Sequence, residues 1–333
     1  MRERYQIILI VALGTAIRII AMLAFAHTPF KPVDVFYVDS QAASSALKLS
    51  NPYMLVYTVR GVGTNVLAYL PVVPLFYAPF SLLGDIRYGS IVADGVIMVS
   101  LYWIGRSISP RAGSLAAGAF ALLPISIDLT SVASTNMMVG TMFLTLSLAA
   151  LLRNRFELSA GLYGVALAAN QLMLLAMPLL IYHFLRHGRA KSFSLAIVSA
   201  LGVILPFFIV APGVFLFDVA VFQFVRPLQP DGWLSLYSVV YSLTGLQLSL
   251  WVRLAAFAAA TAWALSFSRK SKHHFIFSIA FTLALGSFVL PVNGFWNYLL
   301  APCTVACAFT PTIYSRMVKE RQLLSEQIGT SMT

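Results

Sequence analysis

Apolar runs separated by short polar segments follow one another along almost the whole chain. They fall near residues 5–26, 66–83, 88–105, 112–128, 134–152, 158–185, 193–211, 248–268, 274–291 and 297–314. Each run is long enough, or nearly long enough, to cross about 30 Å of hydrocarbon as a helix. Because only helices and closed barrels satisfy every backbone polar group in lipid, the pattern predicts an all-α, polytopic membrane protein with about ten transmembrane helices, some of them short.

Composition points the same way. Of the 333 residues, 59% are apolar and only 10% are charged, and the mean hydropathy is +0.85. Soluble domains are nearer one quarter charged, so a soluble enzyme, a disordered chain and a secreted disulfide scaffold are all excluded. The two cysteines, Cys303 and Cys307, lie four residues apart in an apolar run and form neither a disulfide framework nor a metal-ligand spacing.

Two membrane topologies compete. If every run crosses once from a cytoplasmic N-terminus, four arginines fall outside, against the positive-inside bias: Arg106, Arg111, Arg153 and Arg155. The conflict disappears if two runs behave differently. The run 66–83 contains three prolines and is expected in the outer interface, and the run 158–185, with Asn170 and Gln171 near its middle, is expected to form two short helices that cross and return.

We adopt the second topology, in which most of the basic residues lie on the cytoplasmic side together with both termini. It describes a single multi-pass membrane domain over 1–315, with outer loops 27–87 and 212–247, followed by a cytoplasmic tail over 316–333. The formal charge of +11 is then mainly a topology signal and requires no nucleic-acid partner. The membrane itself is expected to be a plasma membrane or an ER-like membrane.

The aspartates fall on or near the outer face in this topology, and three of them are candidate site residues. Asp34 directly follows the first span beside aromatic side chains, where desolvation raises the pKa of a carboxyl group and suits it to act as a general base. An ordinary solvated loop aspartate is the alternative. Asp39 is either a site residue or the N-cap of a helix expected over Ser40–Leu49, and Asp128 either orients a substrate or caps a helix that starts near 134.

Three arginines lie at or near the outer face. Arg226 ends an aromatic interfacial segment just before a proline, where its guanidinium suits a lipid phosphate; binding to lipid headgroups or to Asp218 without catalysis is the alternative. Arg18 and Arg253 lie within apolar spans, where an unpaired arginine is costly. Each is expected to snorkel outward or pair inside the bundle, and both can approach the same outer cavity.

Short motifs then occur in a recognisable order. After the first span come an early loop aspartate, Ala42-Ala43 and Asn51-Pro52-Tyr53, followed by an aromatic and proline-rich run over 68–84. Later segments end at Arg226-Pro227 and begin at Asn297-Tyr298. In this order the chain resembles the integral membrane glycosyltransferases of the GT-C type, especially their polyprenyl-phosphate-sugar-dependent, mannosyltransferase-like branch. It departs from them in being short and in having Asn170-Gln171 where a lysine is frequent.

The resemblance implies outer-face juxtamembrane helices after the first span, with Asp34 as the catalytic base and Asp39 as second choice. It also implies that Arg226, with Arg60 or Arg253, stabilises a departing lipid phosphate. The further substrate-binding residues that we expect are Asp128, Tyr53, Asn170, Gln171 and Tyr298. No nucleotide is needed at the site, and whether Asp39 or Asp128 adds a metal stays open; their hard oxygen ligands would suit Mg²⁺ or Mn²⁺.

The implied reaction moves a hexose such as mannose from a polyprenyl or dolichyl phosphate to a lipid-linked or glycan acceptor at the outer face, with inversion. The expected partners are therefore this donor, the acceptor and membrane lipids. Two alternatives stay open: a non-catalytic scaffold subunit of GT-C-like fold, and a transporter of lipids or small solutes. A transporter favours mid-membrane charges and repeated halves, and the sequence shows no internal repeat.

Overall fold

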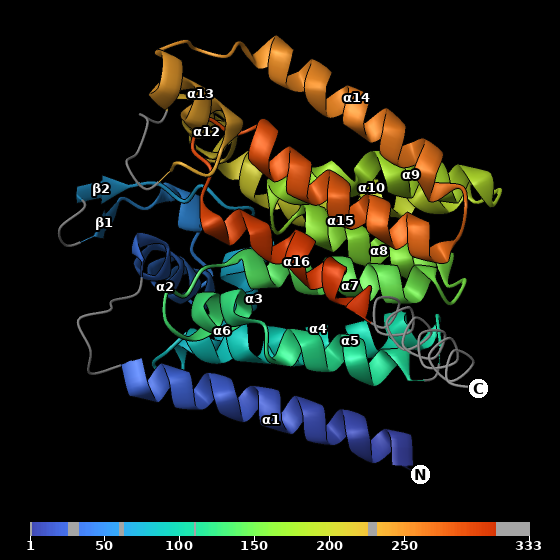
Figure 1. Ribbon diagram of the computed structural model, residues 1–333. Helices are drawn as coiled ribbons and strands as arrows, with labels where there is room; N and C mark the ends of the chain where they lie inside the picture. Colours follow the sequence, from blue (N-terminus) through green and yellow to red (C-terminus); the bar gives the residue numbers. More distant parts are fainter. Residues whose placement is uncertain (1, 26–32, 60–62, 110, 226–231, 311–333) are drawn as a thin grey trace, which may run out of the picture.

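The computed structural model describes residues 2–25, 33–59, 63–109, 111–225 and 232–310, so the predicted site residues Arg60 and Arg226 lie outside the described residues. Helices run side by side along one common direction, with α1 (Arg2–Phe25) on one side of the bundle and α14 (Leu250–Ser268) on the opposite side (Figure 1). The predicted all-α, polytopic architecture is confirmed.

Five helices of the described chain are long and apolar enough to cross a membrane: α1, α4 (Arg87–Arg106), α10 (Ala190–Val210), α14 and α15 (Lys272–Val289). A sixth span results if α5 (Ala112–Ala121) and α6 (Pro124–Ser131), bent by 50° from each other, count as one. Shorter apolar helices pack among them: α7 (Met137–Leu151), α8 (Phe156–Leu167), α9 (Met177–Arg186) and α16 (Leu300–Cys307).

Short elements gather at one end of the bundle, on the left of Figure 1. From the first half of the chain they are α2 (Asp34–Leu47), η1 (Pro52–Met54), β1 (Tyr57–Val59), β2 (Gly63–Asn65) and α3 (Val72–Ser81). From the second half they are α11 (Pro212–Leu216), the π-helix η3 (Phe217–Val221), α12 (Phe222–Val225) and α13 (Leu236–Thr244). The antiparallel hairpin β1–β2 is a small β element that the all-α prediction did not include.

The helix expected over Ser40–Leu49 begins earlier, at Asp34, with Val33 as its N-cap residue. Asp34 belongs to the first turn, and its Oδ1 accepts a hydrogen bond of 2.9 Å from the backbone N–H of Val35. A carboxylate is favourable there because the helix dipole is positive at its N-terminus. Asp39 therefore lies inside α2, and its interpretation as an N-cap is wrong.

The two runs assigned unusual roles are both interrupted. In the run 66–83 only α3 is helical, and its ten residues span about 15 Å, half of the hydrocarbon thickness. In the run 158–185 the helix α8 ends at Leu167, and the Oδ1 of Asn170 then accepts a bond from the N–H of Leu172 at the start of η2 (Gln171–Ala176). Two short helices with a break at Asn170 are what the sequence predicts.

Basic side chains meet at the opposite end of the bundle from the short elements. The indole of Trp103 carries the guanidinium of Arg153 at 3.6 Å from the ring centroid and that of Arg106 at 5.9 Å. Arg186 donates a 3.1 Å hydrogen bond to the carbonyl of Arg269, which joins two further turns. This clustering at the end where α1 begins matches the adopted topology (Figure 1). That this end faces the cytoplasm stays a prediction.

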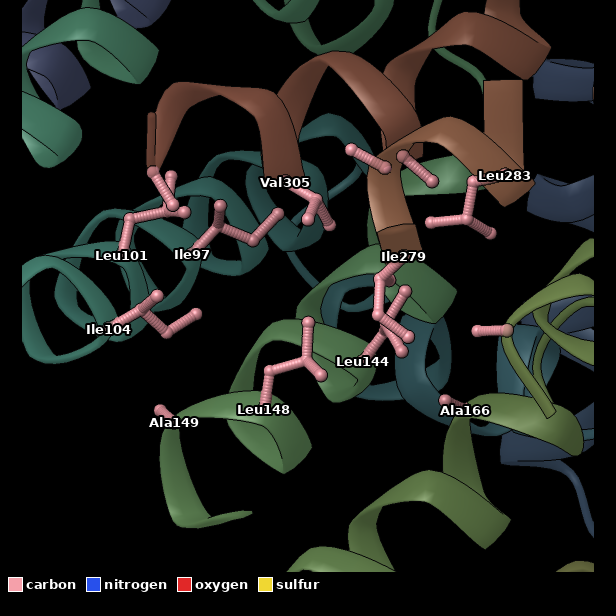
Figure 2. Close-up of a cluster of buried hydrophobic side chains, with 14 of the residues drawn as sticks. Ile97, Leu101, Ile104, Leu144, Leu148, Ala149, Ala166, Ile279, Leu283 and Val305 are labelled. Carbon is pink, nitrogen blue, oxygen red and sulfur yellow. The ribbon is translucent and has the colours of Figure 1, made fainter. Parts of the chain in front are cut away.

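The main apolar core lies where four helices converge (Figure 2). Fully or almost fully buried side chains meet there, namely Ile97 and Leu101 of α4, Leu144 and Leu148 of α7, Ile279 and Leu283 of α15, and Val305 of α16. Because lipid tails are as apolar as these side chains, close packing holds such helices together. At the contact of α8 with α10, a Cβ added to Gly164 would lie 2.2 Å from the carbonyl oxygen of Ala196, so only glycine fits.

Arg18 pairs inside the bundle. Its side chain is 0% exposed and its Nε donates to Asp94. Its Nη1 donates at 3.0 Å to the carbonyl of Ala121, and its Nη2 donates at 2.6 Å to the hydroxyl of Ser126. Asp94 also accepts 2.8 Å bonds from Ser126 and Thr130. The expectation that Arg18 approaches an outer cavity is therefore wrong, and the residue joins α1 to α4.

Candidate functional site

A cavity of about 470 Å³ lies next to the short elements. Its walls come from the residue before α7, the break between α8 and α9, the π-helix η3, the first turns of α14, and the segment 290–298. Four of the residues predicted to bind substrate line it: Asn170, Gln171, Arg253 and Tyr298. The fold thus brings together side chains that are more than 120 positions apart in the sequence.

Arg253 is the charged residue among the described residues of the cavity wall. It is 5% exposed, its Nη1 donates to the carbonyl of Leu290, and its guanidinium lies 5.3 Å from the ring centroid of Tyr237. Its Nε has no hydrogen-bond partner within the described chain, and neither of the two salt bridges found there involves it. A buried cation without a carboxylate is costly unless an anion joins it, so this position favours an anionic ligand.

Asn170 and Gln171 also line the cavity, but their amides are committed to the scaffold. Besides capping η2, Asn170 donates from Nδ2 to the sulfur of Met137 at 3.0 Å. The Nε2 of Gln171 donates to the carbonyls of Ala68 and Val219, both at 3.0 Å. Gln171 therefore ties the segment before α3 to the π-helix and holds two walls of the cavity in register.

Asp34 is half-buried and firmly oriented. Its Oδ2 accepts a 2.9 Å bond from the Nδ2 of Asn65, while its Oδ1 is held by the N–H of Val35. The Oδ1 of Asn65 in turn accepts from the N–H of Val66 at 2.9 Å, which fixes the amide. Asn65 belongs to β2, so the hairpin that the sequence did not reveal is the element that positions this carboxylate.

Asp39 is almost completely buried, with 1% of its surface exposed. Burial raises the pKa of this carboxyl well above its usual range; the amide of Asn136 opposes the rise, and the nearby charge of Asp34 adds to it. The amide of Asn136 faces this carboxyl, but the contact does not reach normal hydrogen-bond geometry, so the Oδ1 of Asp39 and the Nδ2 of Asn136 are each left without a partner among the residues that the structure describes. Asn136 also lines the cavity, whereas neither Asp34 nor Asp39 does, so Asn136 links Asp39 to the cavity wall.

Two further predicted residues, Tyr53 and Asp128, do not line the cavity. Tyr53 is fully buried, and its hydroxyl donates at 2.5 Å to the carbonyl of Tyr69, which does. Asp128 lies within α6, and its backbone carbonyl accepts from the N–H groups of Val132 and Ala133. Because α7 begins only at Met137, the interpretation of Asp128 as the cap of a helix near 134 is wrong.

Sequence reasoning missed the roles of several polar residues. Asp218, considered only as a partner of Arg226, is 3% exposed in the π-helix; burial raises the pKa of Asp218 to about 6, and a hydrogen bond from the N–H of Leu67 opposes this. Asn65 and Asn136 were not singled out as site residues, and Asn297 entered only as the first residue of the Asn297-Tyr298 motif. For Asn65 and Asn136 the sequence signal is an amide beside an apolar run, which is too common to single them out.

No group of three or more His, Cys, Asp or Glu side chains in the described part of the chain is placed to hold a metal ion. Asp39 and Asp128 therefore lack a third acidic, histidine or cysteine ligand and do not fit the Mg²⁺ or Mn²⁺ site considered from the sequence. We derive no step through a metal.

No protein-family model and no curated protein sequence matches the chain. Among solved structures, ArnT from Cupriavidus metallidurans bound to undecaprenyl phosphate has a TM-score of 0.63 and 13% identity, covering 96% of this chain and 62% of that one. The Archaeoglobus fulgidus oligosaccharyltransferase in its apo form has a TM-score of 0.55 and 10% identity, covering 98% of this chain and 52% of that one.

A second structure from that organism, AglB with an inhibitory peptide and a dolichol-phosphate, has a TM-score of 0.53 and 11% identity, with coverages of 98% and 52%. These neighbours are GT-C glycosyltransferases, and the chain has the GT-C fold that its sequence resemblance implied. It spans 62% of the length of the first neighbour and 52% of the length of the other two.

Proposed function

From the GT-C fold and the cavity, we propose that the chain is a membrane glycosyltransferase that uses a polyprenyl- or dolichyl-phosphate sugar. It moves a hexose to a lipid-linked or glycan acceptor at the outer face. The observation that carries the proposal is Arg253, a buried arginine in a cavity of about 470 Å³ with no carboxylate partner among the described residues. The undecaprenyl phosphate and dolichol-phosphate bound in two structures of the same fold support a lipid phosphate as the anion.

The cavity has the size and chemistry for such a donor. Ligand pockets are usually about 300–1,000 Å³, so a sugar phosphate and the first part of its lipid fit. The Nε of Arg253 is a free donor for a phosphate oxygen, and Leu250 and Leu254 add an apolar wall on α14 for the isoprenoid chain. Bonds between a guanidinium and a phosphate are charge-assisted and therefore stronger than neutral ones.

In the proposed reaction, Asp34 accepts the proton of the acceptor hydroxyl as its oxygen attacks the anomeric carbon. The bond from that carbon to the phosphate oxygen breaks, the configuration inverts, and polyprenyl phosphate leaves. Charge grows on the departing phosphate, where Arg253 stabilises it. Asp34 suits the role of base better than Asp39, because Asn65 orients Asp34 at a partly exposed position whereas burial favours the neutral form of Asp39.

The test compares membranes that contain wild type, Asp34→Asn or Asp39→Asn, each given labelled polyprenyl-phosphate sugars and an acceptor fraction. We expect Asp34→Asn to lower transfer by about 10²–10⁴-fold, the usual contribution of a general base, and to remain inserted. Loss of transfer in Asp39→Asn alone would identify Asp39, and not Asp34, as the base. No transfer from any donor by correctly inserted wild type would overturn the enzyme and favour the scaffold or the transporter.

A further inference from the structure

The cavity contains unsatisfied polar atoms beyond the guanidinium of Arg253. The Nδ2 of Asn136 and the Oδ1 of Asn297 are both buried and have no hydrogen-bond partner within the described residues. Asn136 is 1% exposed and stands at the N-cap position of α7, yet its side chain makes no capping bond. The amide of Asn136 also faces Asp39, but without a hydrogen bond of normal geometry. One donor and one acceptor are therefore available in the wall of the cavity that contains the arginine.

These two amides differ from the other pair of amides in the wall. Asn170 and Gln171 are bonded to Leu172, Ala68 and Val219 of the backbone, so they hold the scaffold. Asn136 and Asn297 contribute no such bond from the atoms named above. Buried polar groups are nearly always paired in folded proteins, so an unpaired amide that faces a cavity points to a ligand that completes it.

The missing partner has a definable chemistry. A hydroxyl group both donates and accepts, and it can satisfy either a free amide N–H or a free amide oxygen. A ligand ammonium group would instead need a carboxylate. Among the described residues no Asp or Glu lines the cavity, although Asp39 lies next to Asn136. The phosphate is accounted for by Arg253. The remaining groups suit the hydroxyls of an uncharged sugar.

We propose that Asn136 and Asn297 are specificity-determining residues that bind the sugar hydroxyls of the donor, while Arg253 binds its phosphate. The inference rests on the proposed function and deepens it. It separates two parts of one donor: the sugar is recognised by carboxamides and the leaving group by the guanidinium. Removing either amide should then weaken the binding of the sugar-bearing donor but not the binding of the bare lipid phosphate.

The experiment measures the affinity of full-length protein in nanodiscs for two lipids, polyprenyl-phosphate hexose and bare polyprenyl phosphate. We expect Asn136→Ala and Asn297→Ala each to weaken the binding of the hexose lipid by about threefold to tenfold, which corresponds to the loss of one neutral hydrogen bond. The bare lipid should bind within about twofold of wild type, because it lacks the hydroxyls. Donors that each lack one hydroxyl identify the contact: the variant loses no further affinity for the donor missing its partner.

A matched control is Asn154→Gly. Asn154 is an exposed amide in the turn between α7 and α8, and its φ of 59° is one that glycine adopts freely. Equal weakening of both lipids by the cavity variants would overturn the proposal, since it means that the amides shape the cavity without reading the sugar. Failure of bare polyprenyl phosphate to bind wild type would instead refute the proposed function, so the two failures are distinguishable. The Asn297 variant tests the proposal even if Asn136→Ala fails to fold beside Asp39.

Discussion

Replacing Arg253 by glutamine should weaken donor binding while leaving the ligand-free protein as stable as wild type, or more so. The two effects oppose each other because Arg253 is 5% exposed and no described carboxylate neutralises it. Without a ligand, the guanidinium is a buried charge whose removal relieves a desolvation cost. With a ligand, the same group supplies the bond to the phosphate.

The size of the binding effect follows from the bonds that are free to form. The Nε of Arg253 has no described partner, whereas its Nη1 is already used by the carbonyl of Leu290. A hydrogen bond to a charged group contributes about 1.5–3 kcal/mol, so losing it should raise the Kd by about 10- to 150-fold. Arg253→Lys keeps the charge but loses the planar set of N–H donors, so its Kd should lie between those of wild type and Arg253→Gln.

The assay is thermal unfolding of the full-length protein in nanodiscs, with and without polyprenyl phosphate. At a lipid concentration of about 100 times the wild-type Kd, binding stabilises wild type by about 2.7 kcal/mol. A Kd raised about 30-fold leaves about 0.9 kcal/mol in Arg253→Gln at that concentration. The reasoning is refuted if the variant keeps the full ligand-induced shift, or if its only defect is a lower ligand-free unfolding temperature.

Two further predictions concern buried acids. Asp94→Asn leaves the guanidinium of Arg18 buried without its counter-ion and should destabilise the protein by about 3–5 kcal/mol, measured as a lower unfolding temperature. The double variant Arg18→Met with Asp94→Leu should recover much of this stability. An unchanged unfolding temperature in Asp94→Asn would contradict the buried ion pair. For Asp218, the pKa is about 6 in the folded chain and about 3.9 when unfolded, so the folded state binds the proton more tightly. The free energy of unfolding should therefore fall by about 3 kcal/mol as the pH rises from about 4 through 6. Unfolding temperatures measured at several pH values should show a smaller fall in Asp218→Asn than in wild type. Parallel pH profiles for Asp218→Asn and wild type would contradict the role of Asp218.

The sequence predicted the membrane class, the break at Asn170 and the interrupted run at 66–83, because these depend on local signals. Apolar length reports a span, and prolines or amides within a run report an interruption. The start of α2 was missed because Asp39 and Ser40 are good N-cap residues, and this signal outweighed the acidic first turn at Asp34.

The candidate site was only partly predictable. Arg253 stood out because an arginine within an apolar run needs a reason, but the sequence treated Arg18 in the same way. Only the fold separates them, since Asp94 meets Arg18 from 76 positions away and no described acid meets Arg253. Asn136 and the hairpin residue Asn65 become candidates through their neighbours in space, which neither periodicity nor spacing encodes. Asn297 stood in a motif, but its unpaired oxygen in the cavity wall is visible only in the fold.

The bond between Arg18 and Asp94 also sets an order of events during synthesis. Arg18 emerges from the ribosome 76 residues before the acid that neutralises it, so α1 meets the membrane with its charge still unpaired. Inserting an arginine at mid-span costs about 2.5–3.5 kcal/mol. Because α1 is more apolar than α4, its other side chains offset that cost, and α1 can insert before α4 is made. The arrival of α4 then supplies Asp94, the counter-ion of Arg18.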